Sequence, residues 1–242
     1  MKKKTFAARL ASAGLALWFA MIACTLPNTA SVGDLRTESH SIDLGSASTA
    51  RVQIEFPAGE LKVESGASSL MEGSFRYNAA DWEPQVSYTQ NGTQGDLLIN
   101  QKDDTLSVGD RLVIQWDIQL NEEVPIELNV RTGAGTSDLA LGKLNLTGLT
   151  IETGVGVTTV DLNGVWLHDV EVSIEGGLGE ITVNLPAEMG VRVEMDTALV
   201  SVTATGLTKT ESGYVNRAYG AAPYTLTLKM QAGVGSVILV AP

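Results

Sequence analysis

The chain has 242 residues, a length that suits one large β domain or two small ones. Its first 23 residues hold four basic residues and no acidic one, so the remainder carries 12 basic against 28 acidic residues, a net charge of −16. A body this acidic repels nucleic acid and anionic lipid headgroups, and a single cysteine excludes an intramolecular disulfide and a cysteine-cluster metal site.

Residues 1–23 have the pattern of a secretory signal, in which the basic "MKKKTFAAR" precedes the apolar "LASAGLALWFAMIA". Cys24 follows directly, and "MIAC" resembles the bacterial lipobox, with Met21 where leucine is usual. The alternatives are an ordinary signal peptide cut elsewhere and a short membrane anchor. We expect a lipid on Cys24, attachment to a membrane through that lipid, and a place in the bacterial cell envelope outside the cytoplasm.

Residues 24–45 are rich in Ser, Thr and Gly, and we interpret them as a lipidated tether. From residue 46 to residue 242 apolar and polar residues alternate between glycine-containing turns, which predicts one all-β domain. "NGTQG" at 91–95 separates two alternating runs and predicts a hairpin. The pattern is less regular over 46–127 and repetitive over 128–242.

The second half of the chain repeats one motif. The segments "LNVRTGAGTSDLAL", "LTIETGVGVTTVDL" and "VSIEGGLGEITVNL" align at steps of 21 and 23 residues, and "VEMDTALVSVTAT" and "LTLKMQAGVGSVILV" continue the series. In the fourth copy Leu199 takes the place of the second glycine. A period of about 21 residues predicts a β-solenoid-like stack of short strands with glycine corners. The expected corners are Gly133, Gly135, Gly154, Gly156, Gly177, Gly179, Gly233 and Gly235.

The G-x-G pairs also invite comparison with a phosphate-binding loop. Such a loop needs a helix whose N-terminus faces the phosphate, but "VTTVDL" follows Gly156 and alternates as a strand does. We therefore interpret the glycines as corners and expect no cofactor.

An insertion, "TKTESGYVNRAYGAAPYT" at 208–225, separates the last two copies and holds three of the five tyrosines. Insertions in repeat proteins often bind partners, and tyrosines suit contact with proteins or glycans. We favour the other interpretation, that the insertion caps the end of the stack, because a terminal coil would otherwise expose its strand edges. We expect Tyr224 to cap and Tyr214 to be the most exposed of the three tyrosines. The candidate residues for capping or partner binding are Tyr214, Arg217, Tyr219 and Tyr224.

Residues 70–185, with "FRYN", "PQVSY", "WDIQL" and "VPIELNV" ahead of "GAG" and "GVG", resemble the bacterial toast-rack family of adhesin-like envelope proteins. That family is close to the cell-wall-active-antibiotic-response domains. The resemblance implies a β-solenoid-like stack on an extracytoplasmic protein, and it implies no catalytic residue. The fourth copy departs from the glycine pattern, so its corner must turn differently.

No residue pattern indicates catalysis. His168 and Asp169 lack a nucleophile motif and suit a local turn, and the loop with Asp103, Asp104 and Asp110 does not match calcium spacing. We therefore expect no metal site, although a calcium-stabilised adhesin is a weaker alternative. The favoured function is a non-enzymatic, adhesin-like or envelope-response module that binds another envelope protein or a glycan. The alternative is a carbohydrate-binding or carbohydrate-active protein that uses Trp82, Trp116 or Trp166 with nearby carboxylates.

Overall fold

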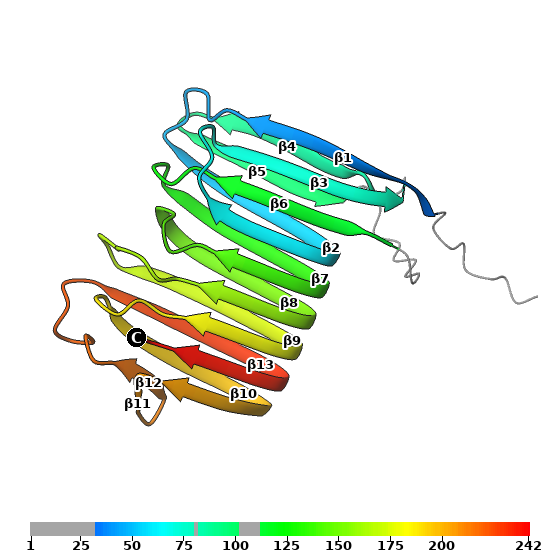
Figure 1. Ribbon diagram of the computed structural model, residues 1–242. Coiled ribbons are helices and arrows are strands. Elements are labelled where there is room, and N and C mark those ends of the chain that lie inside the picture. Colours follow the sequence, from blue (N-terminus) through cyan, green and yellow to red (C-terminus); the bar gives the residue numbers. More distant parts are fainter. Residues whose placement is uncertain (1–31, 80–81, 102–111) are drawn as a thin grey trace, which may run out of the picture.

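The computed structural model describes residues 32–79, 82–101 and 112–242 and contains no α-helix in these ranges. All of its strands join one sheet, which Figure 1 shows as a long stack. The strands are β1 (Val32–Ile42), β2 (Thr49–Ser65), β3 (Met71–Ala79), β4 (Pro84–Asn91), β5 (Gln94–Gln101), β6 (Ile114–Leu120), β7 (Ile126–Ala140), β8 (Leu146–Asp161), β9 (Val170–Asn184), β10 (Gly190–Thr205), β11 (Leu207–Lys209), β12 (Gly213–Asn216) and β13 (Thr225–Val240).

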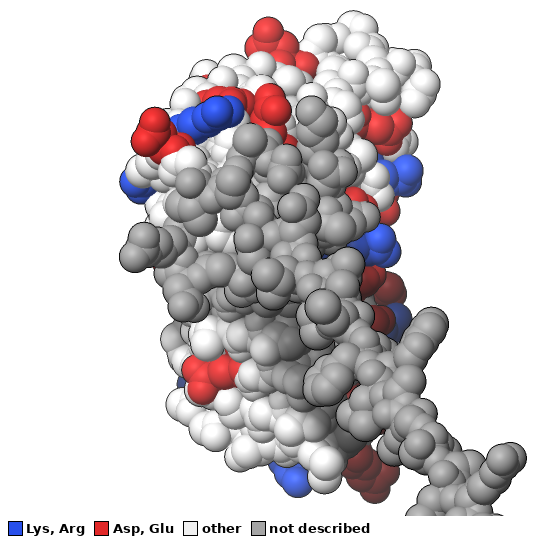
Figure 2. Space-filling view, turned by 90° about the vertical axis from the view of Figure 1, so that its right-hand side faces the viewer, with Lys and Arg blue, Asp and Glu red and all other residues white. Residues whose placement is uncertain are grey.

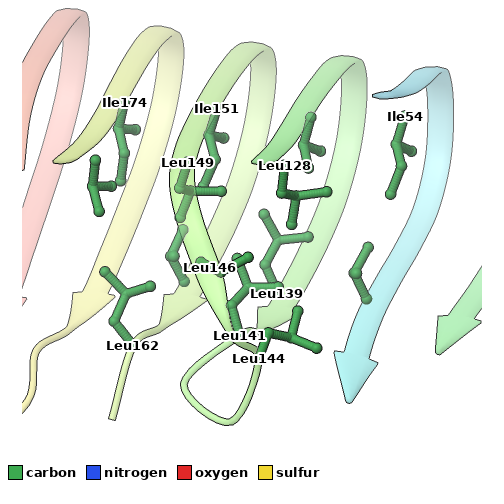
Figure 3. Packing of buried hydrophobic residues seen from close by; sticks show 14 of the residues in the cluster. Ile54, Leu128, Leu139, Leu141, Leu144, Leu146, Leu149, Ile151, Leu162 and Ile174 are labelled. Carbon is green, nitrogen blue, oxygen red and sulfur yellow. The ribbon is translucent and has the colours of Figure 1, made fainter. Parts of the chain in front are cut away.

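Six of these strands are long and bend over in the middle, so that each forms an arch with two arms (Figures 1 and 3). The arches lie side by side in the order β2, β7, β8, β9, β13 and β10, and neighbours pair in parallel along both arms. This confirms the all-β, solenoid-like fold. The units are strands of 15–17 residues rather than short ones, because the backbone stays extended through the corner.

The bends lie at the glycines, which stack in rows along the arches. Gly156 has a φ of +141°, and a Cβ there would lie 1.9 Å from the main-chain oxygen of Gly135. Only glycine combines this backbone conformation with so close an approach. The row of positive-φ glycines contains Gly59, Gly135, Gly156, Gly179 and Gly235. A second row makes similarly close backbone contacts without positive φ and contains Gly133, Gly154, Gly177 and Gly233.

The core fills the space between the two arms (Figure 3). Alternate residues of each arm point inward, so Leu128, Leu149 and Val172 follow one another in register on one arm, and Leu139 and Val160 do so on the other. Burying one such side chain contributes roughly 1.5–3 kcal/mol. The same apolar position therefore recurs in every copy of the repeat.

At the N-terminal end, the two arms of β2 are continued by separate strands. β5 and β4 extend the first arm as a hairpin, which confirms the predicted turn, and β6, β3 and β1 extend the second arm. Residues 32–42, which we expected in the tether, instead form β1. Their Glu38, His40 and Ile42 turn toward the sheet, and His40 packs edge-on against Phe75 at 5.5 Å between ring centroids.

At the C-terminal end, the stack does not follow the order of the chain. β13 lies between β9 and β10, so the fourth copy of the repeat is the last arch, and the short strands β12 and β11 pair beyond its first arm. Val200, and not Leu199, pairs with Gly235 in the row of positive-φ glycines. Val200 has no positive φ. The corner of β10 therefore turns without the positive φ that requires glycine in the other arches.

Candidate functional site

Exposed apolar and aromatic side chains gather on the side of the stack opposite the glycine corners, where loops connect one arch to the next. Val165 is 88% exposed and Leu167 is 74% exposed, both in the loop between β8 and β9. Tyr219 and Tyr224, 41% and 37% exposed, precede β13 on the same side. We call these four residues the loop-end patch.

A pocket of about 110 Å³ lies beside Val165 and Tyr224 of the loop-end patch. Val165 and Tyr224 line it together with the buried Trp166, and so do Met189 and Glu188 from the turn before β10. The pocket therefore joins three connections that are far apart in the sequence. The pocket has an apolar wall, one tyrosine and one carboxylate. This lining suits contact with another molecule, and it does not bring together the several titratable groups that acid–base catalysis needs.

The loop that carries Val165 and Leu167 is held in place by its own residues. The indole Nε1 of Trp166 donates a hydrogen bond to the main-chain oxygen of Leu162 at 3.1 Å. This anchors Trp166 inward, and its two neighbours in the chain are exposed.

His168 lies in the turn before β9 and contacts both its own turn and the loop before β8, where Oδ1 of Asn145 lies 3.4 Å from its Nε2. Its Nδ1 donates to the main-chain oxygen of Asp169 at 2.9 Å, and a carboxylate oxygen of Asp169 accepts from the main-chain N–H of Thr225 at 2.8 Å. Asp169 thereby links this loop to the start of β13.

The insertion is anchored by a residue that the sequence analysis did not single out. Asn216 is buried, and its Oδ1 accepts from the main-chain N–H of Val191 at 2.9 Å. Its Nδ2 donates to the main-chain oxygens of Pro186 and Met189 at 3.2 and 2.7 Å. The side chain therefore fixes the turn before β10. An asparagine in a polar run gives no sign of such a role in the sequence.

The expected exposure of the tyrosines is reversed in the structure. Tyr214 lies on β12 opposite Val193 of β10 and packs against the core, whereas Tyr224 and Tyr219 are exposed. Tyr224 comes just before β13 begins, beyond the point where a neighbouring arch could cover it. Arg217 is exposed. The expected capping contact is thus made by Tyr214 rather than by Tyr224.

The tryptophans of the carbohydrate alternative do not face solvent. Trp82, Trp116 and Trp166 are all buried. Trp116 borders a hollow of about 370 Å³ with Glu60, Asp117 and Asp138, yet its ring packs edge-on against Phe56 and Phe75. Little of any of these rings is available for a glycan to stack on, because none is more than 8% exposed.

Some expected features lie outside the described residues, namely the signal segment 1–23, Cys24, the tether up to residue 31, and Asp103, Asp104 and Asp110. Within residues 32–79, 82–101 and 112–242, no three His, Cys, Asp or Glu side chains are grouped as a metal site would require. The same part of the chain holds no helix long and apolar enough to cross a membrane.

The chain is similar to several known proteins. A crystal structure of a candidate cell adhesion protein from Clostridium sporogenes is 29% identical, covers 86% of this chain and 100% of its own, and superposes with a TM-score of 0.84. Candidate adhesins from Bacteroides fragilis and Parabacteroides distasonis are 11% and 12% identical over 86% of this chain and 97% and 98% of their own, with TM-scores of only 0.30 and 0.27. No curated protein matches the chain. The model of the N-terminal toast-rack domain matches residues 31–184, and the chain with its stacked, glycine-cornered arches belongs to the toast-rack family.

Proposed function

We propose that this protein is a non-enzymatic, adhesin-like module of the bacterial cell envelope that binds a partner protein through its loop-end patch. The observation that carries the proposal is the exposure of Val165 and Leu167 beside the pocket that Tyr224 lines. Exposed apolar residues with a tyrosine at a pocket are typical of protein-binding surfaces.

The arch stack supports this function by holding the patch rigidly. Trp166, Asp169 and Asn216 tie the loops of the patch to the strands through the hydrogen bonds described above. A surface that is already ordered loses less conformational entropy on binding. The similarity to the candidate cell adhesion protein of Clostridium sporogenes supports the same kind of role.

Attachment to the membrane is the second part of the proposal. The basic and apolar segments before Cys24 favour export, and the "MIAC" sequence favours a lipid on Cys24. A lipid and a net charge of −16 after residue 23 fit an acidic domain that is held at a membrane by acyl chains rather than by a basic patch. Labelling cells with a fatty acid analogue tests this part, since Cys24→Ser must abolish the label.

The binding part is tested with cells that display the full chain and are allowed to adhere to a layer of immobilised cells. We expect Val165→Ser combined with Leu167→Ser to reduce adhesion, because the change removes apolar contact area from the patch. Leu35→Ser is the matched control, since Leu35 is exposed on β1, away from the patch. Urea midpoints of all variants should agree, because substitutions of exposed residues change stability by about 0.5 kcal/mol or less. Undiminished adhesion of the double variant would contradict the proposal.

A further inference from the structure

A row of exposed apolar side chains runs across the bends of the arches, on the side of the stack where the glycine corners lie. It consists of the middle residues of the G-x-G motifs and their equivalent in β10. The strand registers place Val155, Leu178, Val234 and Leu199 next to one another in that order. All four are between 47% and 75% exposed. We call these four residues the arch-top ridge.

The arch-top ridge is continuous because neighbouring strands lie about 4.8 Å apart, which brings successive side chains into contact range. Glycines flank Val155, Leu178 and Val234, so no neighbouring side chain in the same strand covers these three residues, whereas Leu199 lies between Ala198 and Val200. Ala134 continues the row on β7 with a smaller side chain. A contiguous apolar row of this kind marks a contact surface more often than a single exposed residue does.

The first strand, β1, also begins on the side of the glycine corners. Val32, the first residue of β1, pairs with Ala79 at the end of β3, and Tyr77 of β3 pairs with Ile114 of β6. Gln115 pairs with Glu60, which follows the corner glycine Gly59. In Figure 1 the start of β1 and the bends of the arches accordingly lie on the same side.

Cys24 precedes Val32 by eight residues, which can span at most about 28 Å.

We propose that the arch-top ridge rests on the surface of the bilayer to which Cys24 is attached. This inference depends on the lipid anchor proposed above. A short tether holds the ridge at a high effective concentration near the bilayer, so that even weak insertion of valine and leucine side chains at the headgroup level is populated. The stack then lies along the membrane, and the loop-end patch faces away from it.

The charged residues around the arch-top ridge indicate which kind of lipid surface the ridge can contact. Glu152, Glu175 and Asp196 lie along one arm beside the ridge, and Glu180 lies on the other arm. Arg131 forms an ion pair with Glu152 at 3.1 Å, so Glu175, Asp196 and Glu180 carry most of the negative charge. Figure 2 looks onto this side of the stack, where uncharged atoms form most of the visible lower part and carboxylates lie toward its edges. These carboxylates favour a zwitterionic surface over an anionic one, and they disfavour a second copy of the chain, whose carboxylates would face them.

The test uses the full lipid-modified chain in phosphatidylcholine vesicles that contain a phosphatidylcholine spin-labelled near its headgroup. An environment-sensitive fluorophore is attached at Leu178→Cys or Val234→Cys, and at Val165→Cys in the loop-end patch as the control. The introduced cysteine is the only free thiol, since Cys24 is the only native cysteine and is blocked by its lipid. We expect the spin label to quench the two ridge fluorophores and to leave the fluorophore at position 165 unquenched.

Each other outcome contradicts a defined part of the proposal. If the chain floats with the vesicles but the ridge fluorophores stay unquenched, the arch-top ridge does not contact lipid, while the lipid anchor stands. If the chain does not float, the anchor fails and this inference fails with it. Equal quenching at position 165 shows that the stack has no fixed orientation. A change in emission that follows the density of protein rather than that of spin label shows contact between copies of the chain.

Discussion

At the scale of single residues, the corner glycines limit what this chain can vary. Gly156 combines a φ of +141° with a carbonyl oxygen 1.9 Å from the position that a Cβ would take. Gly66 has a similar φ of +129°, but nothing lies within 4 Å of its Cβ position. The two residues therefore separate the cost of the backbone conformation from the cost of the contact between arches.

We predict that Gly156→Ala destabilises the protein clearly more than Gly66→Ala does. Both variants place an alanine at positive φ, which costs on the order of 1–3 kcal/mol. Only Gly156→Ala also pushes neighbouring arches apart. Urea unfolding of the two variants measures the difference, and equal losses would show that close approach between the arches is not what requires glycine.

At the scale of elements, β1 shows that tertiary contacts can bring a segment with the composition of a linker into a sheet. Tyr77 of β3 is buried, and its hydroxyl donates a hydrogen bond to the carboxylate of Glu38 on β1. Burial first, and this bond second, raise the pKa of Tyr77 to about 12. The folded protein therefore holds the phenolic proton more tightly than the unfolded chain, in which the pKa of tyrosine is about 10.

The stability contributed by Tyr77 should be present in full below about pH 10 and be lost as the pH rises toward about 12, because the raised pKa favours the protonated folded state. We predict that the free energy of unfolding of the wild type falls more steeply across this interval than that of Tyr77→Phe, which has no proton to lose. Urea unfolding at the two ends of the interval measures both slopes. Parallel slopes would rule out a titrating contact between β1 and β3.

At the scale of the whole molecule, the order of the arches departs from the order of the chain. β13 can occupy the inner place because it has Gly235, where a Cβ would lie 1.8 Å from the main-chain oxygen of Gly179 on β9. β10 has Val200 at the equivalent position and lies at the end of the stack. Since each arch contacts only its neighbours, β10 depends on β13 for its place.

We predict that a chain ending at residue 206, which lacks the insertion and β13, keeps β2, β7, β8 and β9 folded but leaves β10 detached. Hydrogen exchange of the monomeric fraction measures this, and the amides of Val191–Met195 should lose the protection that they have in the full chain. Protection that persists there would mean that β10 can pair directly with β9, and that Gly235 does not decide the order of the arches.

The sequence by itself determined the all-β class, the period of the repeat and the residues at the corners. These features are local, because alternation sets which side chains face the core and the G-x-G motif marks where a strand must bend. Only the tertiary structure decided that β1 joins the sheet, that β13 lies inside β10, and that Tyr214 is covered while Tyr224 is exposed. Each of these depends on which strand lies alongside which, and strand pairing across long stretches of chain leaves no periodic signal in either strand alone. The arch-top ridge and the loop-end patch belong to the same category, since their residues meet only when the arches stack.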